Sequence, residues 1–323
     1  MSIVDEYLLK EIDEAKERID ESRLDTFVNA MCHNNIRQAN LQAPIQDGDN
    51  ASRRDEVIAN FNRAWEYGVN NYNGFGLILL SEIVGKVEPA LKSPMKDYAE
   101  FRQNKASLKG LDYLPPIDEQ RIRAHLEKML VALKTEDFHP VEEAVFLNFH
   151  LTRIQPFANG NKRTASIITN LTLNHNSFPV IYVRPEEKVI YTSLLDAATR
   201  SFGEQQNDAY LNPNYQQRGF LEFMGNKVLR QLQCAEDELA QLCRYHIDMD
   251  IKSPGVAYAV KQRVDSWFRR RDKPYQLTLS PKAGTLDVVG AIPYEVLDEI
   301  VGRSNDNGKK KIKKYRIITL SGN

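Results

Sequence analysis

The spacing of hydrophobic residues predicts a chain that is mainly helical over its first 250 residues. Apolar side chains recur at every third or fourth position, as on one face of a helix. The expected helices cover residues 2–20, 22–42, 53–69, 77–87, 117–133, 140–152, 164–174, 187–199 and 216–245. Residues 101–113 are short, half-polar and closed by Pro115 and Pro116, which is typical of a β-hairpin.

The pattern changes after residue 250. Helices are expected over residues 255–270 and 293–301, and strands over residues 275–280, 285–289 and 312–320. The first two strands are joined by the turn sequence Pro-Lys-Ala-Gly. We therefore expect a small C-terminal α/β appendage behind a helical core.

Charge changes this picture only at the C-terminus. The 43 Lys and Arg residues nearly balance the 44 Asp and Glu residues, so no whole-molecule basic field attracts nucleic acid. Lys309–Arg316 places six bases in eight residues, and Arg269–Arg271 adds a second cluster. Nucleic-acid binding through this run is the less favoured interpretation, because lysines also protect an exposed edge strand from pairing.

Two further features bear on the location of the chain. No run of apolar residues reaches the ~18 that a membrane-spanning helix needs, and the first residues do not resemble a signal peptide. Cys32, Cys234 and Cys243 lack the spacing of a metal site and are expected to be buried, reduced thiols. These features predict a cytoplasmic protein without a membrane span.

The chemistry of the chain is concentrated in residues 155–166, QPFANGNKRTAS, just before an expected helix. Asn159, Gly160 and Asn161 adopt unusual backbone angles at low cost. Backbone N–H groups at a helix start bind anions, and Lys162 and Arg163 add two cations there. A phosphate cradle and an ordinary turn with two solvated bases are both compatible with this fragment, and the fragment alone favours the turn.

The surrounding residues favour the cradle. Residues 154–163 resemble the signature of the Fic family, whose usual form is His-Pro-Phe-x-(Asp/Glu)-Gly-Asn-(Gly/Lys)-Arg-x-x-Arg. The resemblance implies a mainly α fold, with a Fic-type helical core and a β-hairpin flap, followed here by the α/β appendage. It also implies transfer of AMP from ATP to a hydroxyl of a target protein, assisted by Mg²⁺. The related Doc toxins transfer phosphate instead.

The resemblance assigns roles to residues and segments. Gly160, Asn161 and Lys162 would line a phosphate nest, Arg163 would bind the phosphates, and Phe157 would anchor the loop by packing. Phe101, Lys105 and Leu108 would form the flap that docks the target protein. The expected parts are N-terminal helices (1–90), a core with flap (101–113) and active loop (155–163) within 91–205, C-terminal helices (206–250) and the appendage (251–323).

Three positions depart from the signature. Gln155 replaces the general base, and losing a base costs about 10²–10⁴-fold in rate, or about 3–5 kcal/mol. Asn159 replaces the acidic metal ligand, so weaker Mg²⁺ binding is expected. Ser166 replaces a second Arg. His150 lies five residues before Gln155, about 140° around a helix, and is interpreted as an ordinary helix histidine.

The motif leaves two classes of function open. The first is a protein adenylyltransferase whose activity is weakened by Gln155 and Asn159, or a Doc-like phosphotransferase. The second is a catalytically silent, nucleotide-binding regulator or interaction protein. Residues 29–34 are a weak match to the inhibitory helix of Fic proteins, with His33 at the position of its glutamate.

Overall fold

The structure is a computed structural model that describes residues 2–19, 53–93, 98–107, 113–203, 210–240, 243–251, 254–271, 275–302 and 312–320. Backbone contacts divide the chain into two compact units. The first comprises residues 1–19 and 35–232, and the second comprises residues 20–34 and 233–323.

The first unit is helical. Its described elements are α1 (Glu6–Glu17), α3 (Arg54–Asn71), α4 (Leu77–Val87), η2 (Pro89–Leu91), α5 (Glu119–Thr135), α6 (Pro140–Ile154), α7 (Asn161–His175), η3 (Pro185–Glu187), α8 (Lys188–Gly203) and α9 (Tyr215–Ala240). The predicted helices over 53–69, 77–87, 117–133, 140–152, 164–174 and 187–199 are confirmed, with ends that shift by a few residues. The helix predicted over 22–42 lies outside the described residues.

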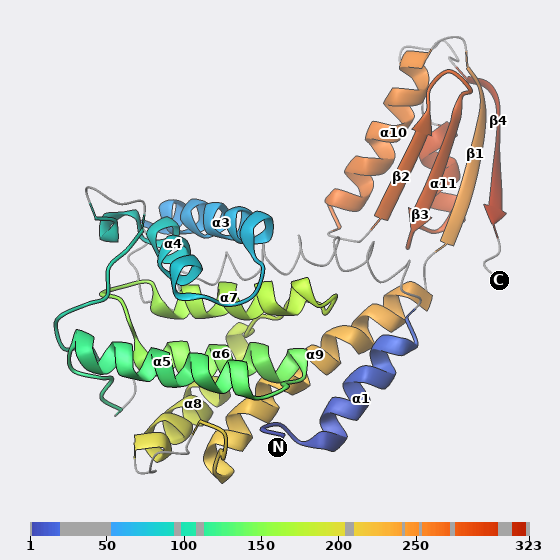
Figure 1. Ribbon diagram of the computed structural model, residues 1–323. Coiled ribbons are helices and arrows are strands. Elements are labelled where there is room, and N and C mark those ends of the chain that lie inside the picture. The colour runs from blue at the N-terminus through green and yellow to red at the C-terminus, as the bar shows by residue number, and fades with distance from the viewer. Residues whose placement is uncertain are drawn as a thin grey trace. The chain divides into compact units, whose positions relative to one another are not determined.

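Helices α6 and α7 form the interior of this unit (Figure 1). Every residue from Ala144 to Ile154 is buried, as expected for a helix that is apolar around most of its circumference. Helices α3 and α4 pack on α7, and α5 packs on α6. The loop of residues 155–160 therefore connects the two most deeply packed helices, a rigid support for a functional site.

The start of α6 is fixed by two local features. Pro140 occupies the first turn, and His139 and Glu142 form a capping box. The Glu142 carboxylate also accepts hydrogen bonds from the backbone N–H groups of Ile3, at 2.8 Å, and Val4, at 3.1 Å. Because Glu142 is buried, these bonds tie the beginning of the described chain to the interior helix.

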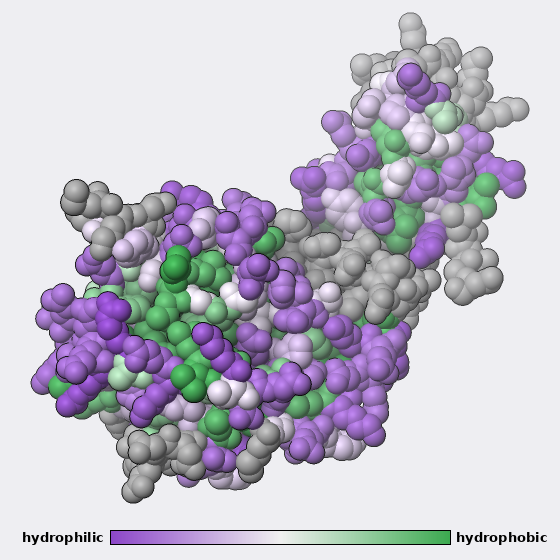
Figure 2. Space-filling view, in the orientation of Figure 1, coloured by the Kyte–Doolittle hydropathy of each residue, from purple (hydrophilic) through white to green (hydrophobic). Residues whose placement is uncertain are grey.

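Most of the visible surface is polar, and hydrophobic residues gather in a few areas (Figure 2). In Figure 2, hydrophobic residues gather on the face that carries α4 and α5, and polar side chains surround them. Exposed apolar side chains on these helices include Ile78 of α4 and Val131 of α5. No helix within the described ranges is both long and apolar enough to cross a bilayer.

The second unit is a small α/β sandwich. It comprises β1 (Cys243–Ile251), α10 (Pro254–Arg269), β2 (Tyr275–Ser280), β3 (Thr285–Gly290), α11 (Tyr294–Gly302) and β4 (Ile312–Leu320). The strands form an antiparallel sheet in the order β2-β3-β1-β4, so the chain follows a split βαβ-βαβ arrangement.

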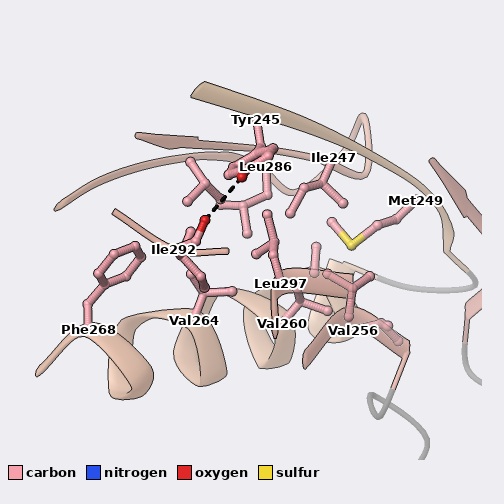
Figure 3. Close-up of a cluster of buried hydrophobic side chains, with 13 residues drawn as sticks. Tyr245, Ile247, Met249, Val256, Val260, Val264, Phe268, Leu286, Ile292 and Leu297 are labelled. Atoms are coloured by element: carbon pink, nitrogen blue, oxygen red, sulfur yellow. Dashed lines mark hydrogen bonds between the residues drawn. The ribbon is translucent and has the colours of Figure 1, made fainter. Parts of the chain in front are cut away.

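Its core lies between the sheet and the helices. Tyr245, Ile247 and Met249 of β1 face Val260 and Val264 of α10 (Figure 3). The buried Tyr245 hydroxyl donates a hydrogen bond to the Ile292 carbonyl at 3.0 Å, which satisfies its polar end. The predicted C-terminal strands and helices are confirmed.

Two predictions were wrong. The helix expected over residues 216–245 ends at Ala240, and residues 243–251 form strand β1. Cys234 is exposed rather than buried. Cys32 lies outside the described residues.

The hairpin expected over residues 101–113 is only partly described. Residues 98–107 have irregular backbone, apart from an isolated bridge between Ala99 and Lys92, and contain no strand. The tip of the predicted hairpin, including Leu108, lies outside the described residues, so the paired hairpin stays a prediction.

Candidate active site

A cavity of about 550 Å³ lies between the flap and the loop that precedes α7. Residues 100–107 form one part of its wall, and Gln155 with residues 157–162 forms the other. The structure thus brings Phe101 and Lys105 of the flap to the same cavity as Gln155, Asn159 and Lys162. The rings of Phe101 and Phe157 lie 5.4 Å apart and join the two parts of the wall.

Gln155 ends α6 in a left-handed conformation, with φ 50° and ψ 59°. A side chain other than glycine in this region costs roughly 1–2 kcal/mol, so neighbouring contacts must hold it. Gln155 is 8% exposed, and its Nε2 donates a hydrogen bond to the Thr152 carbonyl at 2.7 Å. This bond commits the amide nitrogen and leaves Oε1 as the end of the amide that accepts hydrogen bonds.

Arg102 of the flap holds this conformation. Its Nε donates to the Gln155 carbonyl at 2.6 Å, and its backbone N–H donates to the Pro156 carbonyl at 2.9 Å. The guanidinium also donates to the carbonyls of Asn104 and Pro116, each at 2.6 Å. Burial lowers the pKa of Arg102 from its usual value. The sequence does not reveal the role of this residue, because a single Arg in a polar segment carries no spacing signal.

The loop is closed by Asn161. Its Oδ1 accepts a hydrogen bond from the Phe157 N–H at 2.9 Å, and its Nδ2 donates to the Phe157 carbonyl at 2.8 Å. Phe157 is itself buried, as its predicted packing role requires. Asn161 therefore lines the cavity while its amide serves the shape of the loop.

Gly160 starts α7. It has φ 77°, a left-handed angle that glycine adopts without strain, and its carbonyl accepts the Thr164 N–H at 2.9 Å. The N-terminal end of α7, with its partial positive charge, lies at the cavity wall beside Lys162. This end of the cavity is suited to a phosphate group.

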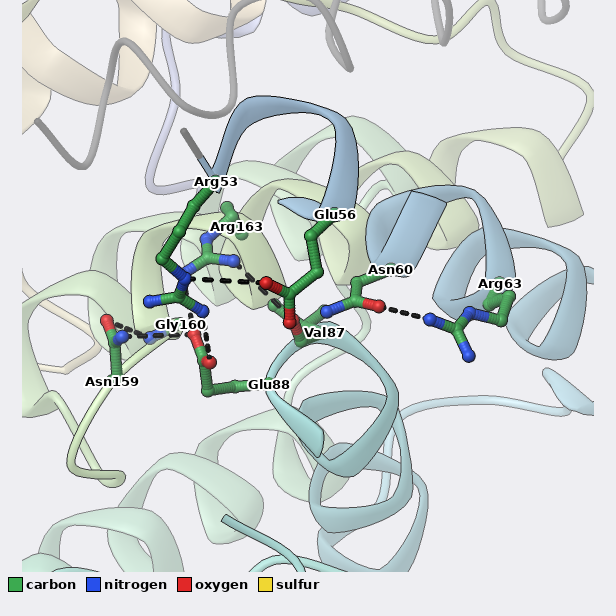
Figure 4. Close-up of polar contacts among 9 residues, drawn as sticks. All are labelled: Arg53, Glu56, Asn60, Arg63, Val87, Glu88, Asn159, Gly160 and Arg163. Atoms are coloured by element: carbon green, nitrogen blue, oxygen red, sulfur yellow. Dashed lines mark hydrogen bonds and ion pairs between the residues drawn. The ribbon is translucent and has the colours of Figure 1, made fainter. Parts of the chain in front are cut away.

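Arg163 is placed differently from the other motif residues. It is 1% exposed and is not among the residues that line the cavity. Its Nη2 pairs with Glu88 Oε2 at 3.1 Å, and its Nη1 lies 3.5 Å from the Val87 carbonyl oxygen (Figure 4). Phosphate binding by Arg163 thus stays a prediction, and the described contacts of its guanidinium are with the end of α4.

Asn159 uses both ends of its amide. Its Nδ2 donates to Glu88 Oε2 at 3.0 Å, and its Oδ1 accepts the Gly160 N–H at 2.8 Å. Glu100 is the one carboxylate among the residues that line the cavity, and the described chain contains no cluster of three potential metal-ligating side chains. This donor set does not fit a metal ion held by the protein, because Mg²⁺ is usually bound through one or two carboxylates.

His150 lies away from the cavity wall. It is fully buried, and its ring stacks on Tyr210 at 4.6 Å. Burial lowers the pKa of His150 well below its usual value, with the charge of Arg153 acting in the same direction. His150 is therefore a neutral interior side chain and does not stand in for the missing base. Ser166 is not a cavity residue either, and residues 29–34 lie outside the described part of the chain.

The fold and the cavity define a helical protein with a cavity at the start of a buried helix, bounded on one side by a flap. The sequence model of the Fic/DOC family matches residues 80–173, which span the flap, α5, α6, the loop and most of α7. Residues 80–173 are therefore a Fic/DOC family domain.

Curated relatives and a solved structure agree with this domain. The chain is 27% identical over 116 residues to Protein adenylyltransferase Fic of Aedes aegypti and 26% identical over 122 residues to that of Drosophila persimilis. These segments cover 36% and 38% of this chain, and 22% and 23% of the relatives. The chain thus spans less than a quarter of the length of these proteins.

The fold comparison covers more of the chain. A Fic domain containing signaling protein from Bacteroides thetaiotaomicron superposes with a TM-score of 0.53 at 15% identity, over 72% of this chain and 94% of the other. At this identity the match shows that the two proteins share the fold.

Proposed function

We propose that this chain binds ATP in the cavity between the flap and the loop, and transfers AMP to a hydroxyl group of a target protein. The hydroxyl oxygen forms a bond to the α-phosphorus, the bond between the α- and β-phosphates breaks, and pyrophosphate leaves. The observation that carries the proposal is the shared cavity, because it joins the flap, Gln155 and the start of α7 in one recess. The curated relatives, which are named protein adenylyltransferases, support the choice of reaction.

Each part of the wall has a role in this proposal. The N-terminal end of α7 and Lys162 attract the phosphates of ATP. Phe101, Lys105 and Leu108 would present the target segment beside the opening, where an extended peptide is held through its backbone. Arg163 acts from behind the loop, and its charge is balanced by Glu88.

Gln155 sets the rate. Its Oε1 accepts a hydrogen bond from the target hydroxyl and orients the attacking oxygen, but an amide does not take up the proton near neutral pH. Water then accepts the proton, and the step is slower by about 10²–10⁴-fold than with a positioned base. Nucleotidyl transfer depends largely on positioning and electrostatic stabilisation, as phosphoryl transfer does, so activity survives at a low level.

Mg²⁺ has a reduced role in this site. The loop offers the ion the amide of Asn159 in place of a carboxylate, and both ends of this amide are already hydrogen bonded. Any ion would be bound mainly through phosphate oxygens of the nucleotide, and weak dependence on Mg²⁺ is part of the proposal.

A second candidate is a nucleotide-binding protein without transfer activity. The contact that favours it is the hydrogen bond from Gln155 Nε2 to the Thr152 carbonyl. This bond holds the Gln155 side chain against the last turn of α6, and the amide offers no titratable group at the position of the general base. In this case ATP binds to the same cavity and changes the affinity for a partner protein.

Calorimetric titration with ATP tests the shared part of both candidates. Lys162→Ala is expected to weaken ATP binding about tenfold, because it removes the cation that lines the cavity beside the N-terminal end of α7. Lys134→Ala is the matched control, since Lys134 is an exposed lysine of α5 away from the cavity wall, and it should leave the affinity unchanged. Equal ATP affinities of wild type and Lys162→Ala would show that the cavity is not the nucleotide site.

A further inference from the structure

The described contacts of the Glu88 carboxylate are all with the loop–helix junction and with α3. Glu88 follows the last residue of α4 and is 4% exposed. Its Oε2 accepts hydrogen bonds from Asn159 Nδ2 at 3.0 Å and from Arg163 Nη2 at 3.1 Å, and its Oε1 accepts one from Arg53 Nη2 at 2.9 Å. Both oxygens of a buried carboxylate are thus satisfied by side chains from three different elements (Figure 4).

The contact with Asn159 extends into the loop backbone. Asn159 donates to Glu88 and accepts from the Gly160 N–H, so the orientation of its amide is fixed at both ends. The same part of α4 touches Gly160 directly: a Cβ on Gly160 would lie 3.1 Å from Val87 Cγ1. The end of α4 therefore contacts and supports Asn159, Gly160 and Arg163. Of these residues, Asn159 and Gly160 also line the cavity.

We propose that Glu88 is the positioning residue of this site, and that position 159 carries an amide because Glu88 faces it. An aspartate at 159 would bring a second carboxylate to hydrogen-bonding distance of the buried Glu88 carboxylate, and the two like charges would repel each other. It would also lose the N–H donor that Glu88 accepts. Glu88 and Asn159 are thus a matched acceptor and donor, and this inference rests on the proposed nucleotide site only for its effect on ATP binding.

The pair predicts a reciprocal exchange. In Glu88→Gln/Asn159→Asp, the amide at position 88 donates to the carboxylate at position 159, and that carboxylate lies beside Arg163. One carboxylate and one amide are kept, and the net charge around Arg163 is unchanged. Asn159→Asp alone creates two facing carboxylates, and Glu88→Gln alone leaves two amides and removes the charge partner of Arg163.

Hydrogen exchange of the loop amides, in the full chain and without nucleotide, tests the positioning role. Asn159→Asp should raise the amide exchange rate of residues 157–162 about tenfold or more, and Glu88→Gln should raise it less. The double variant should return to within about threefold of wild type. Glu56→Gln is the control, because Glu56 contacts Arg53 at 3.6 Å and makes no described contact with the loop.

The ATP affinities of the same variants give the functional readout. They should follow the same order, with binding about tenfold weaker in Asn159→Asp and largely restored in the double variant. The proposal would be overturned if the fold-changes of the two single variants simply multiply in the double variant. Unchanged exchange of the loop amides in Asn159→Asp would also overturn it.

Two further results separate the possible failures. If wild type does not bind ATP, the proposed function fails, while the exchange measurement still decides the role of Glu88. If Glu88→Gln does not fold, Asn159→Ala removes the donor without adding charge, and unchanged loop exchange in that variant would overturn the proposal.

Discussion

At the scale of single residues, Arg153 is a buried guanidinium that shapes the protonation of its neighbours. Its Nη2 donates to the Tyr210 hydroxyl at 2.9 Å, and its guanidinium carbon lies 3.7 Å from the centroid of the Phe202 ring. Burial, with the positive charges of Arg153 and Lys128, lowers the pKa of His125 to about 4. His125 and His150 are therefore neutral in the folded chain at pH 7.

This arrangement predicts a loss of stability in acid. Between pH 6.5 and 4 the unfolded chain takes up a proton on His125 while the folded chain does not, so the free energy of unfolding falls as the pH falls. Between pH 7 and pH 4.5, the free energy of unfolding in urea should fall by about 1–2 kcal/mol less in His125→Gln than in wild type. This figure is reduced because part of the His125 ring faces solvent. Identical pH profiles for the two proteins would contradict the assigned pKa of His125.

At the residue scale, the sequence reveals the members of a local motif but not their distant partners. Gln155, Asn159 and Lys162 were identified because they stand within one short signature, and the structure places all three at one cavity. Glu88 was missed because it precedes Asn159 by 71 positions and follows an apolar helix without any polar pattern. The sequence does not reveal such a partner, since only packing of α4 against α7 brings the two residues together.

At the scale of elements, β1 shows how a visible pattern was misassigned. Tyr245, Ile247 and Met249 are buried, and Arg244 and Asp248, which alternate with them, are exposed, as in a half-buried strand. The preceding helix α9 extends to Ala240, and the prediction continued its period across this change. The alternation of apolar and polar residues was present in the sequence, but the helical spacing of the long preceding segment dominated the assignment.

The element that most affects the site is the flap, and Arg102 joins it to the end of α6. Arg102→Lys should lower the free energy of unfolding by about 2–3 kcal/mol in urea denaturation, because a lysine replaces few of the hydrogen bonds that the fork makes to buried carbonyls. Arg121→Lys on the exposed face of α5 is the control and should change the free energy by less than about 0.5 kcal/mol. Equal effects of the two variants would show that Arg102 does not hold the flap.

At the scale of the whole molecule, the predicted mainly helical class with a small C-terminal α/β part is confirmed. Long amphipathic periods and clear turn residues specify such elements locally, so they are readable from sequence. The arrangement of the strands was not readable, because the order β2-β3-β1-β4 depends on contacts between distant segments.

The second unit also bears on nucleic-acid binding. The sheet face opposite the helices carries Arg244, His246 and Asp248 of β1 and Thr285, Asp287 and Val289 of β3. Sheets that bind single-stranded RNA stack bases on aromatic side chains, and these six positions hold none. His246 and Asp287 pair across this face at 2.6 Å. Nucleic-acid binding through Lys309–Arg316 stays a prediction, and within this run Arg316 faces Asp248 in register.

Label transfer tests the central claim most directly, namely that the cavity is a transfer site that lacks its base. Wild type, Gln155→His and Gln155→His/Lys162→Ala would each be incubated in a cell lysate with Mg²⁺ and ATP labelled on the α- or the γ-phosphate. The account predicts α-label on protein with Gln155→His at about 10²–10⁴ times the wild-type level, less label in the double variant, and no γ-label. Absence of α-label with Gln155→His, or label only from the γ-phosphate, would contradict it.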